Sequence, residues 1–196
     1  MKSIFAGILI SIGGSVFLAC DNKYIGSLMF AVALICICYR GDNLFTGRVC
    51  YVPVKHPKGY IKSVLGGLIG NLATTILFGK ILMITRFDLS ESAKIICEQK
   101  LSQLPVETAI RSMMCGILIF LAVDIFGRYK TPIGILFCVP VFILSGWEHC
   151  IADSFYLSIA DAPILESIKF LTIAILGNAI GGMLIPSCER MLNNEL

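Results

Sequence analysis

The fold of this chain is decided by the stretch Ser145-Gly146-Trp147-Glu148-His149-Cys150-Ile151-Ala152-Asp153, which interrupts an otherwise apolar run. Apolar residues 132–144 precede the stretch, and residues 151–159 continue the run after it. Non-helical backbone at membrane depth is tolerated only where it is buried in protein or lines a wet cavity. We therefore expect a membrane helix that is broken in its interior, with the break facing a pathway.

The composition also indicates a membrane protein. Of the 196 residues, 57% are hydrophobic and 15% are charged, whereas a soluble domain has about 45–50% apolar and about 25% charged residues. The mean hydropathy is +0.85. These values exclude a water-soluble globular enzyme. The net charge of +3 comes without the basic stripe that nucleic-acid binding requires.

Six apolar runs follow one another along the chain, and a membrane span needs roughly 20 mostly apolar residues. The runs cover residues 4–20, 24–39, 61–83, 112–126, 132–144 with its continuation, and 164–185. They predict an all-α polytopic membrane protein with six transmembrane helices and a single domain over residues 1–196. The polar segment 90–103 is expected to form a short interfacial helix outside the membrane. The Lys and Arg residues of the short loops favour cytoplasmic termini.

A second break, Arg40-Gly41-Asp42-Asn43-Leu44-Phe45-Thr46-Gly47-Arg48, lies in the other half of the chain. The third apolar runs of the two halves also match, because Gly70-Asn71 in one corresponds to Gly177-Asn178 in the other. We interpret residues of about 1–84 and about 105–187 as two inverted three-helix repeats with broken second and fifth helices. This pattern indicates a transport site near the membrane midplane.

The chemistry at the breaks centres on Glu148 and His149. An ionisable residue inside a membrane is a functional-site hypothesis by default, and histidine can pass on a proton near neutral pH. We expect Glu148 to stabilise the broken helix by bonding exposed backbone N–H groups. Phe45 and Trp147 either pack in the core or narrow a pore. The nine cysteines lack zinc or haem spacing with a nearby histidine, so we expect reduced thiols, no metal and no cofactor.

Three motifs in register resemble the formate/nitrite transporter family: Leu44-Phe45-Thr46-Gly47, Ser145-Gly146-Trp147-Glu148-His149 and Gly177-Asn178-Ala179-Ile180-Gly181-Gly182. The resemblance covers nearly the whole chain. It implies an aquaporin-like six-helix protomer, a homopentamer with one pore through each protomer, and a multi-pass protein of the bacterial inner (plasma) membrane.

The resemblance also implies roles for particular residues. The central threonine and histidine would be Thr46 and His149, and the vestibule lysine would be Lys100. Asn178 matches the asparagine of the sixth span and would lie in the solute pathway with these three residues. The apolar constrictions would be formed by Phe30, Leu34, Leu44, Phe45 and Phe142, with Trp147 in place of the usual phenylalanine. Two positions depart from the family: Gly116 and Asp153 stand where asparagines are usual, which leaves the identity of the solute open.

The predicted function is a channel or transporter for small monovalent anions of weak acids, with formate first and nitrite or hydrosulfide next. The Born energy of moving a bare anion from water into a low-dielectric medium is on the order of tens of kcal/mol. We therefore expect proton coupling and passage as the neutral acid. An aquaporin-like neutral-solute channel is the alternative, although the chain lacks paired Asn-Pro-Ala breaks. An intramembrane enzyme using Glu148 and His149 would lack a nucleophile or metal set, so we expect no enzyme.

Overall fold

The computed structural model describes residues 1–54, 58–85 and 88–194, and these residues form α-helices and connections without a strand. The helices are α1 (Lys2–Ala19), α2 (Lys23–Arg40), α3 (Phe45–Val49), α4 (Tyr60–Leu82), α5 (Ser90–Leu101), α6 (Pro105–Tyr129), α7 (Ile133–Leu144), α8 (Cys150–Ile159) and α9 (Ile164–Asn194). The short helix expected over residues 90–103 is present as α5.

Five of these helices are long and apolar enough to cross a membrane: α1, α2, α4, α6 and α9. The fifth apolar run of the sequence is present as two shorter apolar helices, α7 and α8, on either side of the break. Large apolar side chains such as Ile12, Val32, Ile69 and Phe137 are exposed on the outside of the bundle. Such a surface suits contact with lipid or with other subunits rather than with water.

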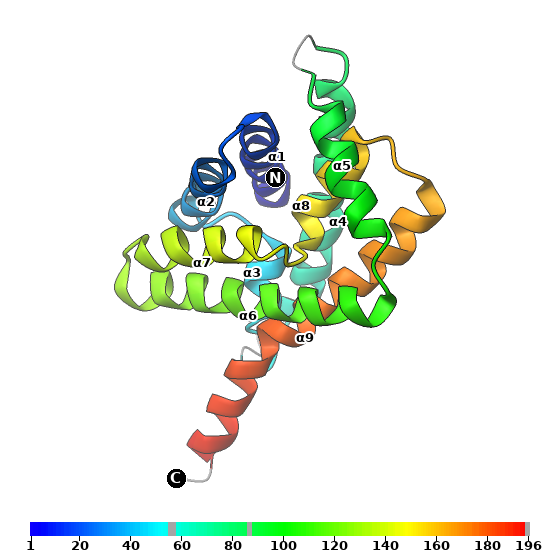
Figure 1. Cartoon of the computed structure of the whole chain (residues 1–196). Helices are drawn as coiled ribbons and strands as arrows, with labels where there is room; N and C mark the ends of the chain where they lie inside the picture. Colours follow the sequence, from blue (N-terminus) through cyan, green and yellow to red (C-terminus); the bar gives the residue numbers. More distant parts are fainter. Residues whose placement is uncertain (55–57, 86–87, 195–196) are drawn as a thin grey trace.

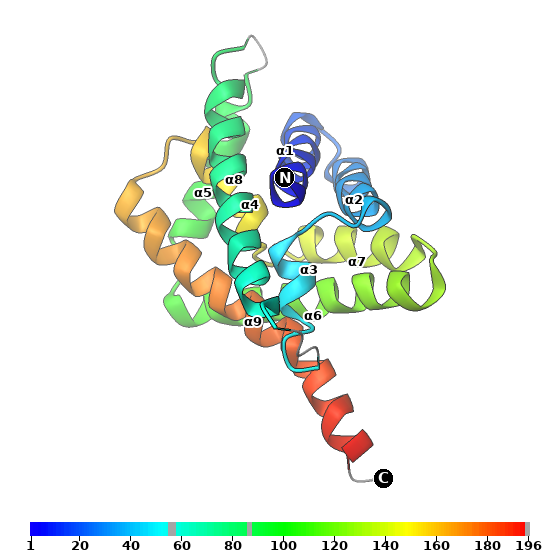
Figure 2. The ribbon, with the colours of Figure 1, turned by 180° about the vertical axis from the view of Figure 1, so that it is seen from behind.

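α8 lies at the centre of the molecule, where it packs against α1, α4, α5 and α9 (Figure 1). α6 lies alongside α7 and packs most extensively against α9, and α1 and α2 form an adjacent pair. Seen from behind, α3 lies beside α4 and α6 (Figure 2). The C-terminal part of α9 extends beyond the rest of the bundle in both views.

The two breaks have the same local geometry. Each preceding helix ends at a glycine in the left-handed region, Gly41 with φ of +64° and Gly146 with φ of +67°, which glycine adopts without a Cβ penalty. The next residue then closes the helix end, because Asp42 N–H donates to Ile37 O and Trp147 N–H donates to Phe142 O. These six-to-one bonds satisfy carbonyls that a helix end would otherwise leave unpaired.

Two buried asparagines fasten the breaks with matching hydrogen bonds. Asn71 accepts from Phe45 N–H at 2.8 Å and donates to the carbonyls of Ser3 and Asn43. Asn178 accepts from Cys150 N–H at 2.9 Å and donates to the carbonyls of Ser112 and Glu148. The amides therefore satisfy backbone groups that cannot bond to water in this interior.

Close contact of α6 and α9 depends on glycines. A Cβ on Gly116 would lie 2.4 Å from Asn178 O, and a Cβ on Gly181 would lie 2.0 Å from Met113 O. Both distances are far inside van der Waals contact, so the helices meet backbone to backbone. This explains the glycine at position 116, because an asparagine side chain there would collide with α9.

Candidate functional site

The two halves of the chain meet at a hydrogen bond between Thr46 and His149. Thr46 lies in α3 and His149 is the N-cap of α8. Thr46 Oγ1 lies 3.0 Å from His149 Nε2, and the two residues are 1% and 2% exposed. The structure thus brings together the threonine and histidine that the sequence singled out on separate breaks.

The bonding of His149 fixes its tautomer. Its Nδ1 accepts a hydrogen bond from Ala152 N–H at 3.1 Å, so this nitrogen carries no proton. In a neutral imidazole the proton then lies on Nε2, which donates to Thr46 Oγ1. This leaves the hydroxyl hydrogen of Thr46 available to donate to a solute. A second proton would sit on Nδ1 of His149, and Nδ1 could then no longer accept the Ala152 N–H bond that caps α8.

Aromatic side chains close the space around this pair. The ring of Phe142 stacks on the imidazole of His149 at 5.6 Å between centroids, and Phe30 packs edge-on against Phe142 at 6.3 Å. Leu34, Leu44 and Phe45 are also buried, at 2–3% exposure. The centre of the molecule is therefore polar at Thr46 and His149 and apolar around them.

A cavity of about 700 Å³ lies on one side of this centre. Five of the expected site residues line it: Lys100, Phe142, Trp147, Glu148 and His149. The other six do not line it and are buried beyond it: Phe30, Leu34, Leu44, Phe45, Thr46 and Asn178. His149 and Phe142 thus separate the cavity from Thr46 and the first break.

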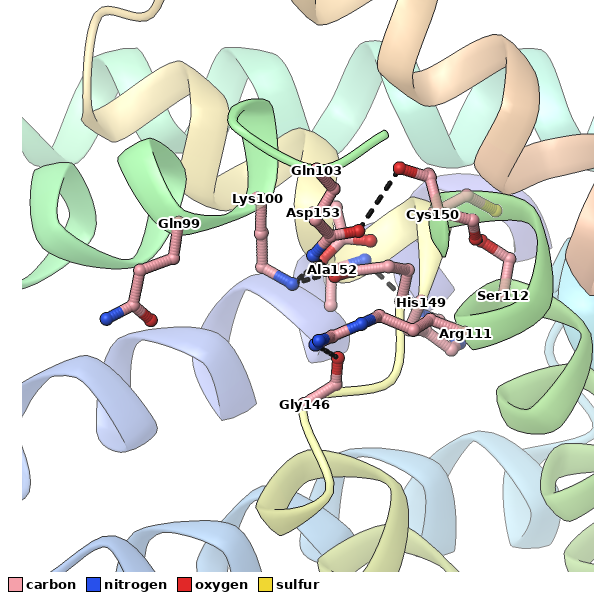
Figure 3. Close-up of polar contacts among 12 residues, drawn as sticks. Gln99, Lys100, Gln103, Arg111, Ser112, Gly146, His149, Cys150, Ala152 and Asp153 are labelled. Atoms are coloured by element: carbon pink, nitrogen blue, oxygen red, sulfur yellow. Dashed lines mark hydrogen bonds and ion pairs between the residues drawn. The ribbon is translucent and has the colours of Figure 1, made fainter. Parts of the chain in front are cut away.

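Lys100 reaches into the cavity from α5 and pairs with two carboxylates (Figure 3). Its ammonium contacts Glu148 Oε2 and lies 2.9 Å from Asp153 Oδ1. Gln103 Nε2 donates to Glu148 Oε1 at 2.6 Å. The side chains of Lys100, Glu148 and Asp153 are 12%, 1% and 2% exposed, so the cluster is nearly dry.

The carboxylates of this cluster stabilise the charge of the Lys100 ammonium. Burial lowers the pKa of the Lys100 ammonium, but the carboxylates of Asp153 and Glu148, when both are ionised, outweigh burial and hold it above its usual range. Lys100 is therefore a fixed positive charge. Asp153 Oδ2 is a buried atom that has no hydrogen-bond partner in the part of the chain that the structure describes, which is unusual because buried polar groups are mostly paired.

Glu148 has contacts different from those predicted. The carboxylate of Glu148 bonds the side chains of Lys100 and Gln103 rather than exposed backbone N–H groups. The backbone groups of the breaks are bonded instead by Asn71 and Asn178, because a side-chain amide can both donate and accept hydrogen bonds. The expected place of Asn178 in the solute pathway stays a prediction; its amide bonds three backbone groups and so positions the second break.

Sequence reasoning missed several polar residues of the cavity wall, and Gln103 and Arg111 are two of them. Gln103 follows Lys100 by three residues, and its side-chain carbonyl oxygen accepts a hydrogen bond from Thr108 Oγ1 at 3.1 Å. Arg111 Nη1 donates to Gly146 O at 3.2 Å, and Arg111 Nη2 pairs with Glu107 at 2.6 Å. The spacing of three residues between Lys100 and Gln103 was the one feature of the sequence that could have indicated Gln103. No sequence pattern indicated Arg111.

These features define a class: a membrane transport protein with several apolar helices and a buried polar site at broken helices. The formate/nitrite transporter family model matches residues 1–190, so the chain belongs to that family. Its relatives are transporters and channels, not enzymes.

Individual relatives agree with this assignment. The formate channel FocB of Escherichia coli (strain K12) is 24% identical over 98% of this chain and 86% of its own length. A formate-nitrite transporter of Plasmodium knowlesi (strain H) is 24% identical over 95% of this chain and 73% of its own length.

Solved structures support the fold. A pentameric formate channel with formate bound has a TM-score of 0.80 and 25% identity, and the match covers 100% of this chain and 96% of that one. An FNT family ion channel has a TM-score of 0.83 at 17% identity, over 98% of this chain and 87% of that one.

Proposed function

We propose that this protein is a channel for small monovalent anions of weak acids, with formate as the first candidate and nitrite or hydrosulfide next. The observation that carries the proposal is the buried Thr46–His149 pair at the end of a cavity that holds Lys100. A formate channel of Escherichia coli among the relatives and a structural neighbour with bound formate support formate as the first solute to test.

In this proposal, the anion crosses as the neutral acid. Lys100 draws the anion into the cavity, and the aromatic constriction at Phe142 removes its water. Desolvation disfavours the charged form of a carboxylic acid, so the anion takes up a proton before it passes. The proton comes from bulk water or through His149 and Thr46. The hydroxyl of Thr46, oriented by His149, then donates a hydrogen bond to the passing solute.

The proposal extends to architecture and assembly. We infer one domain of six membrane crossings in two inverted repeats, about residues 1–84 and about 105–187, with an aquaporin-like arrangement. The matched glycines of the breaks and the matched asparagine bonds support it. In this arrangement α7 and α8 together form the fifth crossing. A pentameric structural neighbour supports a homopentamer with one pore in each protomer.

The proposed location is the bacterial plasma membrane, with both termini in the cytoplasm. Formate channel FocB of Escherichia coli and transporter YwcJ of Bacillus subtilis (strain 168) are bacterial relatives. The cytoplasmic excess of Lys and Arg in short loops supports the orientation. Under this orientation the cavity with Lys100 opens to the outside.

One observation favours an aquaporin-like neutral-solute channel as the second candidate. Within the cavity, two carboxylates, Glu148 and Asp153, contact the ammonium of Lys100. If both are ionised, the cluster carries an excess negative charge that repels anions and leaves neutral solutes unaffected.

The test is stopped-flow uptake into proteoliposomes that contain a pH-sensitive dye, with formate, nitrite and hydrosulfide presented in turn. Weak-acid passage acidifies the interior, and the size of the signal ranks the three solutes. Absence of a protein-dependent signal with all three, from an assembled oligomer, would reject the proposal in favour of neutral solutes. Proton-coupled flux at the wild-type rate in His149→Phe would reject the histidine step.

A further inference from the structure

The Lys100 cluster carries more negative than positive groups. The titratable groups that face Asp153 come from α5, α6, the second break and α8: Cys97, Lys100, Cys115, Glu148, Cys150 and Tyr156. Thiols and phenols ionise in water only near about pH 8.5 and about pH 10, and His149 is neutral in its observed bonding. Two carboxylates therefore share one ammonium, and the ionised cluster would carry a net charge of −1.

A net charge in a nearly dry site is unfavourable, and such a site becomes neutral by binding a proton. The hydrogen bonds identify which carboxylate can bind it. Both oxygens of Glu148 accept from donors, Oε2 from Lys100 and Oε1 from Gln103, so its hydrogen bonds are those of a carboxylate. Asp153 accepts from Lys100 at Oδ1, and no donor among the described residues bonds its Oδ2.

We propose that Asp153 holds one bound proton on Oδ2 in the resting channel, and that an anion enters the cavity only while this proton is present. The proton comes from hydronium in the cavity, which Asp153 lines: an O–H bond forms at Oδ2 and a water molecule remains. No electrons are exchanged. The cluster is then neutral, and the anion meets the ammonium of Lys100 without the repulsion of an unpaired carboxylate.

Loss of the proton has the opposite effect. An ionised Asp153 adds a second negative charge beside Lys100, where the anion must bind, and like charges at short range in a low-dielectric site repel strongly. Anion binding and proton binding at Asp153 therefore favour each other, as linkage requires. Asp153 thus makes anion entry depend on pH through a side chain of the channel, in addition to any protonation of the solute.

The first experiment measures the proton directly and needs no transport. Infrared spectra of the purified oligomer near neutral pH should contain the carbonyl stretch of a protonated carboxylic acid. Asp153→Asn should remove this band, and Asp153→Glu should retain a band at a shifted frequency. Asp161→Asn is the matched control: the hydrogen bond from Lys80 lowers the pKa of Asp161, so its ionised carboxyl contributes no such band. A wild-type spectrum without the band, or its persistence in Asp153→Asn, overturns the proposal.

The second experiment measures entry and rests on the proposed anion channel function. In Asp153→Asn the amide has no charge to gain, so the ratio of its formate uptake to that of the wild type should stay level up to about neutral pH, where wild-type Asp153 holds its proton, and rise at higher pH. The ratio should increase by up to about tenfold per pH unit. A constant ratio overturns the entry requirement. If the wild type takes up no formate, the proposed function fails, and the infrared band still decides whether Asp153 binds a proton.

Discussion

At the scale of the residue, Thr46 and His149 depend on one hydrogen bond. Thr46→Val keeps the volume of the side chain but removes the hydroxyl that His149 orients toward the solute. A lost hydrogen bond costs about 0.5–1.5 kcal/mol, and about 1.4 kcal/mol in a barrier is tenfold in rate. We expect formate flux to fall roughly tenfold in stopped-flow assays, with assembly unchanged. Thr172→Val, which alters an exposed hydroxyl bonded to its own helix, should keep wild-type flux. Equal flux in both variants would contradict a role for the Thr46 hydroxyl.

Also at the scale of the residue, variants of Asn71 and Asn178 test whether the two breaks are equivalent. Replacing either by Ala leaves one backbone N–H and two carbonyls without their partner. An unsatisfied buried group costs about 1–3 kcal/mol, so both variants should unfold at clearly lower temperature in detergent. Asn22→Ala removes an exposed cap of α2 and should cost only about 1 kcal/mol. A large loss in one asparagine variant with none in the other would count against equivalent breaks.

At the scale of the element, the contact of α6 with α9 sets a narrow limit on side-chain size. Gly181→Ala would place a methyl group against the Met113 carbonyl, and the backbones would have to separate. Overpacking costs about 1–3 kcal/mol or more, so we expect a lower thermal unfolding temperature of the detergent-solubilised oligomer. Gly127→Ala is the control on α6, because a Cβ there meets no atom of the described residues within 4 Å. Comparable stability of the two variants would show that the helices do not meet so closely.

Much of this arrangement is readable from the sequence, because its causes are local. The glycine in each break, the polar residues around it and the Gly-Asn pair of each half predicted the breaks and their relation. The apolar runs predicted the membrane helices, and the polar run over residues 90–103 predicted α5.

The remaining features depend on contacts between distant segments. Asp153 was noticed as a departure from the family pattern, but its pairing with Lys100 requires α5 to lie over α8. Gly116 was interpreted as a missing polar group, whereas the backbone of α9 fills that space. The tautomer of His149 depends on the local turn of the backbone at Ala152, which no spacing of residue types specifies.

At the scale of the whole molecule, the cavity and the ion-paired Lys100 lie on one side of the buried Thr46–His149 pair, so the two faces of the protein are chemically different. Function then depends on which face meets the outside. The proposed orientation, with both termini in the cytoplasm, exposes α5 and the cavity to the solute before the membrane is crossed. Anions attracted by Lys100 would accordingly be collected from the external solution.

Two native thiols report this orientation. Cys20 lies at the connection between α1 and α2, and Cys188 is exposed near the C-terminal end of α9. With cytoplasmic termini, a membrane-impermeant maleimide applied to intact spheroplasts should label Cys20, whereas Cys188 should react only after the membrane is opened. Cys20→Ser and Cys188→Ser assign each signal. The reverse labelling would invert the protein in the membrane, so that Lys100 and Asp153 would face the cytoplasm and the proton on Asp153 would control anion exit rather than entry.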